Sequence, residues 1–90
     1  MAFAEYELET PCAGLTPDSD GDSLYRAGLA YSLGNEVDID LVEAHKWFNL
    51  AALKGVEAAK DLRREMADQM SSDEICAAQK AAREWLNLMN

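Results

Sequence analysis

Few side chains in this 90-residue sequence could do nucleophilic chemistry: a single histidine, His45, and two cysteines, Cys12 and Cys76. A hydrolase needs a nucleophile, a base and an orienting group, and nothing in the sequence links Cys76 to His45. One histidine and two distant cysteines do not make a zinc ligand set. We expect His45 to lie on a helix surface or at the edge of its buried face. We expect Cys76 to be a small buried or half-buried thiol. The sequence therefore predicts a protein that is not an enzyme, with no catalytic, cofactor-binding or metal-ligating residue.

A second group of reactive side chains is the run DSDGD at residues 18–22, where carboxylates alternate as they do in calcium loops. The match to an EF-hand is poor, because glycine falls at the fourth position and Leu29 stands where a bidentate glutamate would. We expect a solvated acidic turn whose Asp22 caps the next helix. A calcium-responsive protein stays a minor alternative.

The charge balance excludes two classes of partner. The chain has 8 basic and 17 acidic residues, a net charge of −9. Nucleic-acid binding needs a basic footprint, and anionic membranes attract basic segments, so we expect neither partner. The acidic N-terminus does not resemble a signal peptide, there is no run of 18 apolar residues, and the cysteines show no disulfide framework. These features indicate a cytoplasmic protein.

Acidic residues concentrate before residue 23. Residues 1–22 hold six carboxylates, both prolines and no lysine or arginine. We therefore interpret residues 1–22 as a flexible acidic tail and residues 23–90 as a single domain.

Composition predicts an all-α fold for that domain, because alanine and leucine are abundant while valine, isoleucine and threonine are scarce. Asp40 with Glu43 and Ser71 with Glu74 have the spacing of capping boxes, and Gly34 and Gly55 are typical of helix ends. Four helices follow, at about 23–33, 41–54, 56–69 and 72–89.

The first two predicted helices carry apolar residues on two faces. Tyr25, Leu29 and Leu33 lie away from the inward face of the first helix. Val42, Leu50 and Leu53 do so on the second. Either the last two helices cover these second faces, or one face stays open to receive a partner.

Glycines, alanines and aromatics follow a regular spacing between residues 27 and 59. This stretch resembles a Sel1-like repeat, a relative of the tetratricopeptide repeat. Four positions depart from the family pattern, with Ala27, Glu36, Glu43 and Phe48 standing for Leu, Gly, Lys and Tyr. The residues at the motif positions, Phe48 included, are Gly28, Tyr31, Gly34, Val37, Asp40, Ala44, Trp47, Phe48, Ala51, Ala52, Gly55 and Ala59.

The resemblance implies an antiparallel helix hairpin over about 24–59 with right-handed helical-repeat packing. Residues 56–90 would be a capping extension, similar to that of some bacterial proteins of this kind. Where Glu36 replaces the second loop glycine, a positive φ would suit it poorly. A single repeat cannot bury its own faces, so the extension folds back on it or the chain stacks on another protein.

The resemblance also implies the function. We expect an adaptor or scaffold module that binds a peptide or helix of another protein through a helical face, with a basic partner favoured by the charge. The partner-binding residues would be Tyr25, Leu29, Ser32 and Leu33. The alternative is a structural protein that assembles as a homodimer through the same residues or through Leu50 and Leu53.

Overall fold

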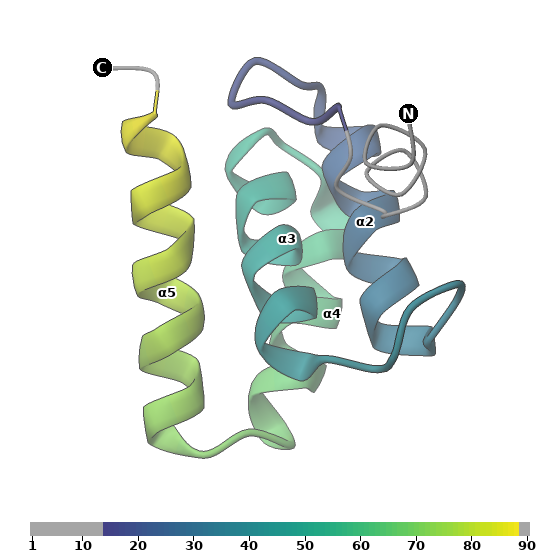
Figure 1. Cartoon of the computed structure of the whole chain (residues 1–90), viewed down its shortest axis with the longest axis vertical. Coiled ribbons are helices and arrows are strands. Elements are labelled where there is room, and N and C mark those ends of the chain that lie inside the picture. The colour runs from purple at the N-terminus through teal and green to yellow at the C-terminus, as the bar shows by residue number, and fades with distance from the viewer. Residues whose placement is uncertain (1–13, 89–90) are drawn as a thin grey trace, which may run out of the picture.

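A computed structural model describes residues 14–88 of the chain, and this part is built from four α-helices without a strand. The all-α fold of about four helices is confirmed. Their bounds differ from the predicted ones by a few residues at most (Figure 1). The helices are α2 (Gly21–Leu33), α3 (Leu41–Leu53), α4 (Glu57–Asp68) and α5 (Ser72–Asn87).

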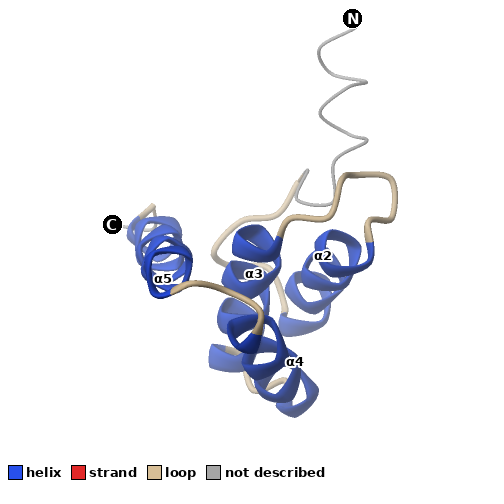
Figure 2. Ribbon diagram, turned by 90° about the horizontal axis from the view of Figure 1, so that it is seen from below, coloured by secondary structure: helices blue, strands red, loops and turns tan. Residues whose placement is uncertain are grey.

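Helix α3 is the centre of the fold. The substantial contacts between helices all involve it, because α2, α4 and α5 each pack on a different side of α3. Figure 2 shows the three helices arranged around α3, with α2 and α5 on opposite sides. A central helix of this kind must be apolar nearly all round, and seven of the thirteen residues of α3 are buried.

Two of the predicted helix caps form as expected. The Asp40 carboxylate accepts a hydrogen bond from the Glu43 backbone N–H at 3.1 Å, which starts α3. At the start of α5, the Ser71 hydroxyl accepts from the Glu74 N–H, while the Glu74 carboxylate accepts from the Ser71 N–H. This is the reciprocal capping box, which satisfies two N–H groups that a helix leaves unpaired.

The predicted cap of the first helix is wrong by two residues. Asp20, not Asp22, is the N-cap of α2, and its carboxylate accepts from the Ser23 N–H at 2.8 Å. Asp22 instead lies in the first turn of the helix. The helix therefore begins at Gly21, before the predicted boundary at residue 23.

Helices α2 and α3 approach so closely that a glycine is required between them. A Cβ atom on Gly28 would lie 2.6 Å from two carbon atoms of the Phe48 ring. Phe48 is fully buried and fills the space that the missing side chain leaves. Most of the positions that resemble the repeat pattern are likewise in the core. Those that are buried are Gly28, Ala44, Trp47, Phe48, Ala51, Ala52 and Ala59.

The remaining motif residues lie in the last turn of α2 or in the loops between the helices. Tyr31 and Val37 are half-buried. Gly34 ends α2 in a left-handed conformation, with φ at 75°, and Gly55 follows α3 with φ at 96°. Both glycines therefore stand where a backbone of positive φ favours them.

The segment before α2 also packs against the helices. Leu15 contacts the core, and Lys54 Nζ donates to the Pro17 carbonyl oxygen at 2.9 Å. Residues 14–20 are thus part of the folded unit, whereas the rest of the predicted acidic tail, residues 1–13, lies outside the described residues. Across residues 14–88, no helix combines the length and apolarity needed to cross a bilayer.

Candidate interaction surface

The four predicted partner-binding residues differ in how far they are exposed. The Tyr25 ring lies against Phe48, with ring centroids 5.8 Å apart, and Leu29 packs partly buried on the core. The Ser32 hydroxyl donates to the Leu29 carbonyl oxygen of its own helix at 3.0 Å. Leu33 is 64% exposed, so it alone of the four presents most of its side chain to solvent.

A second exposed aliphatic residue lies near Leu33. Ile39 is 63% exposed, and its Cγ1 atom packs 3.0 Å from the position a Cβ of Gly34 would take. Sequence reasoning missed Ile39. The available signal was an isolated aliphatic residue between two aspartates, Asp38 and Asp40, in a loop where apolar side chains are uncommon.

Backbone hydrogen bonds hold this loop in place. The N–H groups of Gly34 and Asn35 both donate to the Ala30 carbonyl oxygen, at 2.9 and 3.0 Å. Further along, the Asp40 N–H donates to the Tyr31 carbonyl oxygen at 3.0 Å. Since both ends of the loop are tied to the last turn of α2, Ile39 is presented on a defined backbone.

The tip of the loop carries a strained residue. Glu36 has φ at 65°, and it is the one non-glycine residue with positive φ among those described. The expectation that this position would suit glycine better is therefore supported by the backbone. A side chain in this left-handed region costs on the order of 1 kcal/mol.

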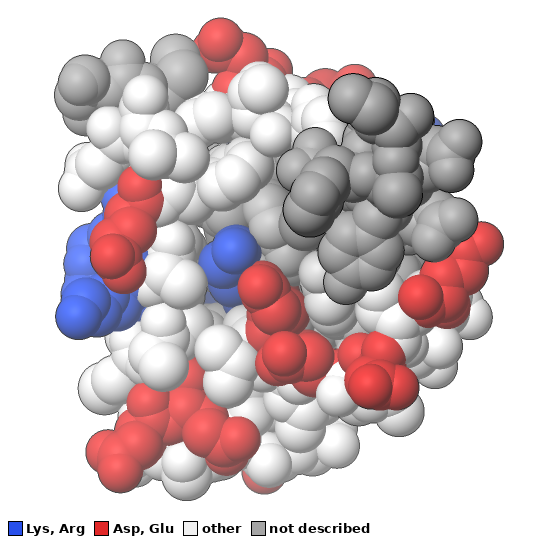
Figure 3. Space-filling model, viewed as in Figure 1, with Lys and Arg blue, Asp and Glu red and all other residues white. Residues whose placement is uncertain are grey.

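The stretch of chain that carries the two exposed aliphatic residues is acidic. Between Arg26 and Lys46 the sequence has four acidic residues and no lysine or arginine. Glu36 and Asp38 are exposed, and neither forms an ion pair with another described residue. Figure 3 shows acidic groups on the side of the molecule where this loop lies. We call Leu33, Glu36, Asp38 and Ile39 the loop patch.

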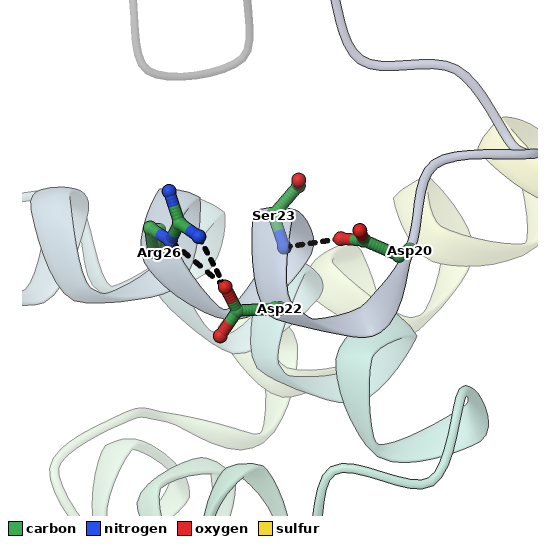
Figure 4. A network of polar contacts seen from close by, with 4 residues as sticks. All are labelled: Asp20, Asp22, Ser23 and Arg26. Carbon is green, nitrogen blue, oxygen red and sulfur yellow. Dashed lines mark hydrogen bonds and ion pairs between the residues drawn. The ribbon is translucent and has the colours of Figure 1, made fainter.

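The acidic run at residues 18–22 serves the start of α2 (Figure 4). Asp20 caps the helix, and its hydrogen bond from the Ser23 N–H lowers the pKa of the Asp20 carboxyl. Asp22 forms an exposed ion pair with Arg26 one turn later. Within residues 14–88 no three acidic, histidine or cysteine side chains gather as a metal site requires, so the calcium alternative has no ligand set there.

Of the two cysteines and the histidine, the two that the structure describes differ from expectation in their exposure. Cys76 is an exposed free thiol on α5, not a buried or half-buried one, because the helix turns this side to solvent. Cys12 lies outside the described residues. His45 is 3% exposed, hence in the core and not at its boundary, because α4 covers that side of α3.

Beside His45, one polar contact joins α3 to α4. Arg63 donates from a guanidinium nitrogen to the Asn49 side-chain oxygen at 2.6 Å. Burial lowers the pKa of His45, and the positive charge of Arg63 lowers it further. Its Nδ1 atom has no hydrogen-bond partner among the described residues. His45 is therefore a neutral core residue at neutral pH, without the hydrogen-bonded orienting group of a catalytic base.

A lysine lies between α3 and α5. Lys46 Nζ is 4.3 Å from the ring centroid of Trp47 and 5.7 Å from that of Trp85. The two indole rings meet edge to face at 4.9 Å. Lys46 Nζ also forms an ion pair with Glu43, whose Oε2 atom is 3.2 Å away. The geometry of this contact is not that of a hydrogen bond. Figure 3 shows a basic side chain in a hollow beside α5.

Searches of protein-family models, curated proteins and solved structures find no match to this chain. We therefore infer the function from the exposed residues of α2 and the loop patch.

Proposed function

We propose that this chain is a non-enzymatic protein–protein interaction module of the Sel1-like type, an adaptor or scaffold component that binds a peptide or helix of a partner. The binding surface is the outer side of α2 together with the loop patch. One observation carries the proposal: Leu33 and Ile39 are both nearly two-thirds exposed, on a backbone that hydrogen bonds fix.

The arrangement of the helices supports this choice of surface. Helices α4 and α5 pack on α3, so neither provides a substantial cover for α2. The other apolar residues of the predicted strip, Tyr25 and Leu29, are half-buried and extend the apolar surface from Leu33 along the helix. A partner helix or extended peptide lying along α2 would contact their exposed edges.

The test is a comparison of two surface variants in affinity capture followed by titration of the purified partner. Leu33→Ser with Ile39→Ser removes the apolar pair, while Leu53→Ser alters a leucine of equal exposure, 64%, at the end of α3. We expect the double variant to lose the partner and Leu53→Ser to keep it. Equal binding by all three proteins would contradict the proposal.

Self-assembly is a competing outcome of the same surface, because two copies could meet through their exposed apolar pairs. Light scattering after size exclusion separates the two. A dimer that Leu33→Ser with Ile39→Ser converts to monomer would replace the adaptor role with a structural one.

A further inference from the structure

We propose that the loop patch binds a basic segment of a partner protein in which lysine or arginine alternates with aliphatic side chains. This inference rests on the proposed function and names the partner class of that surface. It follows from the combination of two exposed aliphatic residues and two carboxylates with no ion-pair partner in one short loop.

The aliphatic part of the patch supplies the contact area. Leu33 ends α2, and Ile39 packs over Gly34 directly after it, so the two side chains lie at the same end of the molecule. Each still exposes more than 60% of its surface. An aliphatic side chain of a partner that covers them would remove apolar surface from water on both sides.

The carboxylates decide what kind of segment can approach. Glu36 and Asp38 are exposed and form no ion pair among the described residues, in contrast to Asp22 and Glu43, which pair with Arg26 and Lys46. A basic residue next to the aliphatic contact would supply the missing opposite charges, whereas an acidic segment would be repelled. Nucleic acids and anionic membranes are disfavoured for the same reason.

The conformation of Glu36 agrees with this assignment. A glycine would adopt φ at 65° without strain, yet the position holds a glutamate at the tip of the loop. The cost is local, and its consequence is an exposed carboxylate in the same loop as Ile39. A fixed loop also loses little conformational freedom on binding, which favours recognition by a small surface.

The experiment is a titration of the isotope-labelled full chain with three synthetic peptides, followed by amide resonances. The peptides have about 12 residues and alternate Leu with Lys, Leu with Glu, or Ser with Lys. We expect only the Leu/Lys peptide to bind, with a dissociation constant on the order of 100 µM, and to shift the amides of residues 33–39 most. Raising the salt concentration should weaken binding.

Variants of the protein separate charge from apolar contact. Glu36→Gln with Asp38→Asn removes both charges while keeping a non-glycine side chain at residue 36, and we expect binding to weaken about 3- to 10-fold. Leu33→Ser with Ile39→Ser should weaken it about tenfold or more. The control Leu53→Ser should leave it unchanged, since Leu53 is a similarly exposed leucine at the end of α3.

Three results would overturn the inference: equal binding of the Leu/Glu peptide, no effect of Glu36→Gln with Asp38→Asn, or shifts centred away from residues 33–39. These results leave the proposed function separately testable. If Leu33→Ser with Ile39→Ser abolishes capture of a natural partner while the Leu/Lys peptide fails to bind, the module stands and its partner is not basic.

Discussion

At the scale of single residues, Glu36 shows how a local cost is tolerated inside a stable fold. Its backbone has φ at 65°, while the rest of the loop is held by hydrogen bonds to Ala30 and Tyr31. These bonds fix the path of the loop, so the strain cannot relax without breaking them. The position is therefore one where stability and the proposed binding function oppose each other.

Replacing Glu36 by glycine should stabilise the protein. Relief of the left-handed strain is worth about 1 kcal/mol, and the greater freedom of glycine in the unfolded chain takes back part of it. We expect the free energy of unfolding to rise by about 0.5 kcal/mol in chemical denaturation. Glu65→Gly is the matched control: Glu65 is exposed within α4, and the change there should cost about 1 kcal/mol. A loss of stability in Glu36→Gly would contradict the argument.

His45 gives the fold a pH dependence in a range where few other groups titrate. It is the sole histidine of the sequence, and burial and Arg63 lower its pKa in the folded state. Above the unfolded pKa of about 6.5 the imidazole is neutral in both states and costs nothing. As the pH falls below that value, the imidazole takes up a proton in the unfolded chain before it does so in the folded protein. The free energy of unfolding therefore decreases.

We expect the free energy of unfolding to fall between about pH 6.5 and pH 5, with a slope no greater than about 1.4 kcal/mol per pH unit for this one group. His45→Gln should be less stable at pH 7 through altered packing, but it should lack this slope. Denaturation curves of both proteins across the range measure the difference. An unchanged slope in the variant would assign the pH dependence to other groups.

The caps show what sequence can decide at this scale. Asp40 and Ser71 are each followed by a glutamate at capping-box spacing, Glu43 and Glu74, and both caps were predicted correctly. Before α2, however, three aspartates alternate at 18, 20 and 22, and local sequence offers no reason to choose among them. The choice depends on Gly21, whose missing side chain lets the first turn pack against Val56.

At the scale of elements, the approach of α2 to α3 depends on a glycine facing a ring. Gly28→Ala should gain helix propensity but force the Phe48 ring out of its place, because the new Cβ would lie 2.6 Å from it. We expect a net loss of about 1 to 2 kcal/mol in unfolding free energy. Ala30→Gly is the reverse substitution at a half-buried position of the same helix, and it should lower stability through the poorer helix propensity of glycine. Wild-type stability in Gly28→Ala would mean that the helices can move apart freely.

Helix α5 has two buried residues, as α4 does, but both of those in α5 are alanines. Ala78 and Ala82 are its two buried positions, and Trp85 adds its contact with Trp47. A helix held in this way is expected to open locally before the rest of the domain unfolds. Its docking on α3 alone was not predictable, because the apolar stripe of α5 is equally compatible with packing on α2 or α4.

Trp85→Ala should therefore loosen α5 selectively. We expect faster amide hydrogen exchange along residues 72–87, while α2 and α3 keep most of their protection. Leu86→Ala is the control on the neighbouring position, since Leu86 is 36% exposed on the same helix. Uniform loss of protection across all four helices would show that α5 unfolds together with the core.

At the scale of the whole molecule, the fold closes around α3. The four largest fully buried side chains, Trp47, Phe48, Leu24 and Leu50, come from α2 and α3 alone. Five large apolar residues of the described part of the chain are exposed, and two of them, Leu33 and Ile39, belong to the loop patch. A stable dimer interface buries about 1,200 Å² or more, which two aliphatic side chains do not approach.

We therefore expect a monomer in solution. Light scattering after size exclusion should give a mass near 9.9 kDa over a wide range of protein concentration. A concentration-dependent mass near twice that value would contradict this expectation and favour the homodimer.

The sequence predicted the number of helices and most of the core, because helix propensity, caps and small-residue spacing are local properties. It did not predict which outward-facing residues stay exposed. Tyr25 and Leu29 were placed on an open strip, yet both pack partly on the core, and the Tyr25 ring lies against Phe48 of α3. Exposure depends on neighbours that are distant in sequence.

The contact between Trp47 and Trp85 has a practical consequence for every experiment on this protein. The chain contains just these two tryptophans, and their rings touch across the boundary between α3 and α5. Intrinsic fluorescence, excited at wavelengths that tyrosine does not absorb, therefore reports on one boundary only. Release of α5 should change the emission strongly, whereas a ligand at the loop patch should change it little, because α2 and α5 lie on opposite sides of α3. Tryptophan emission can therefore distinguish these two events.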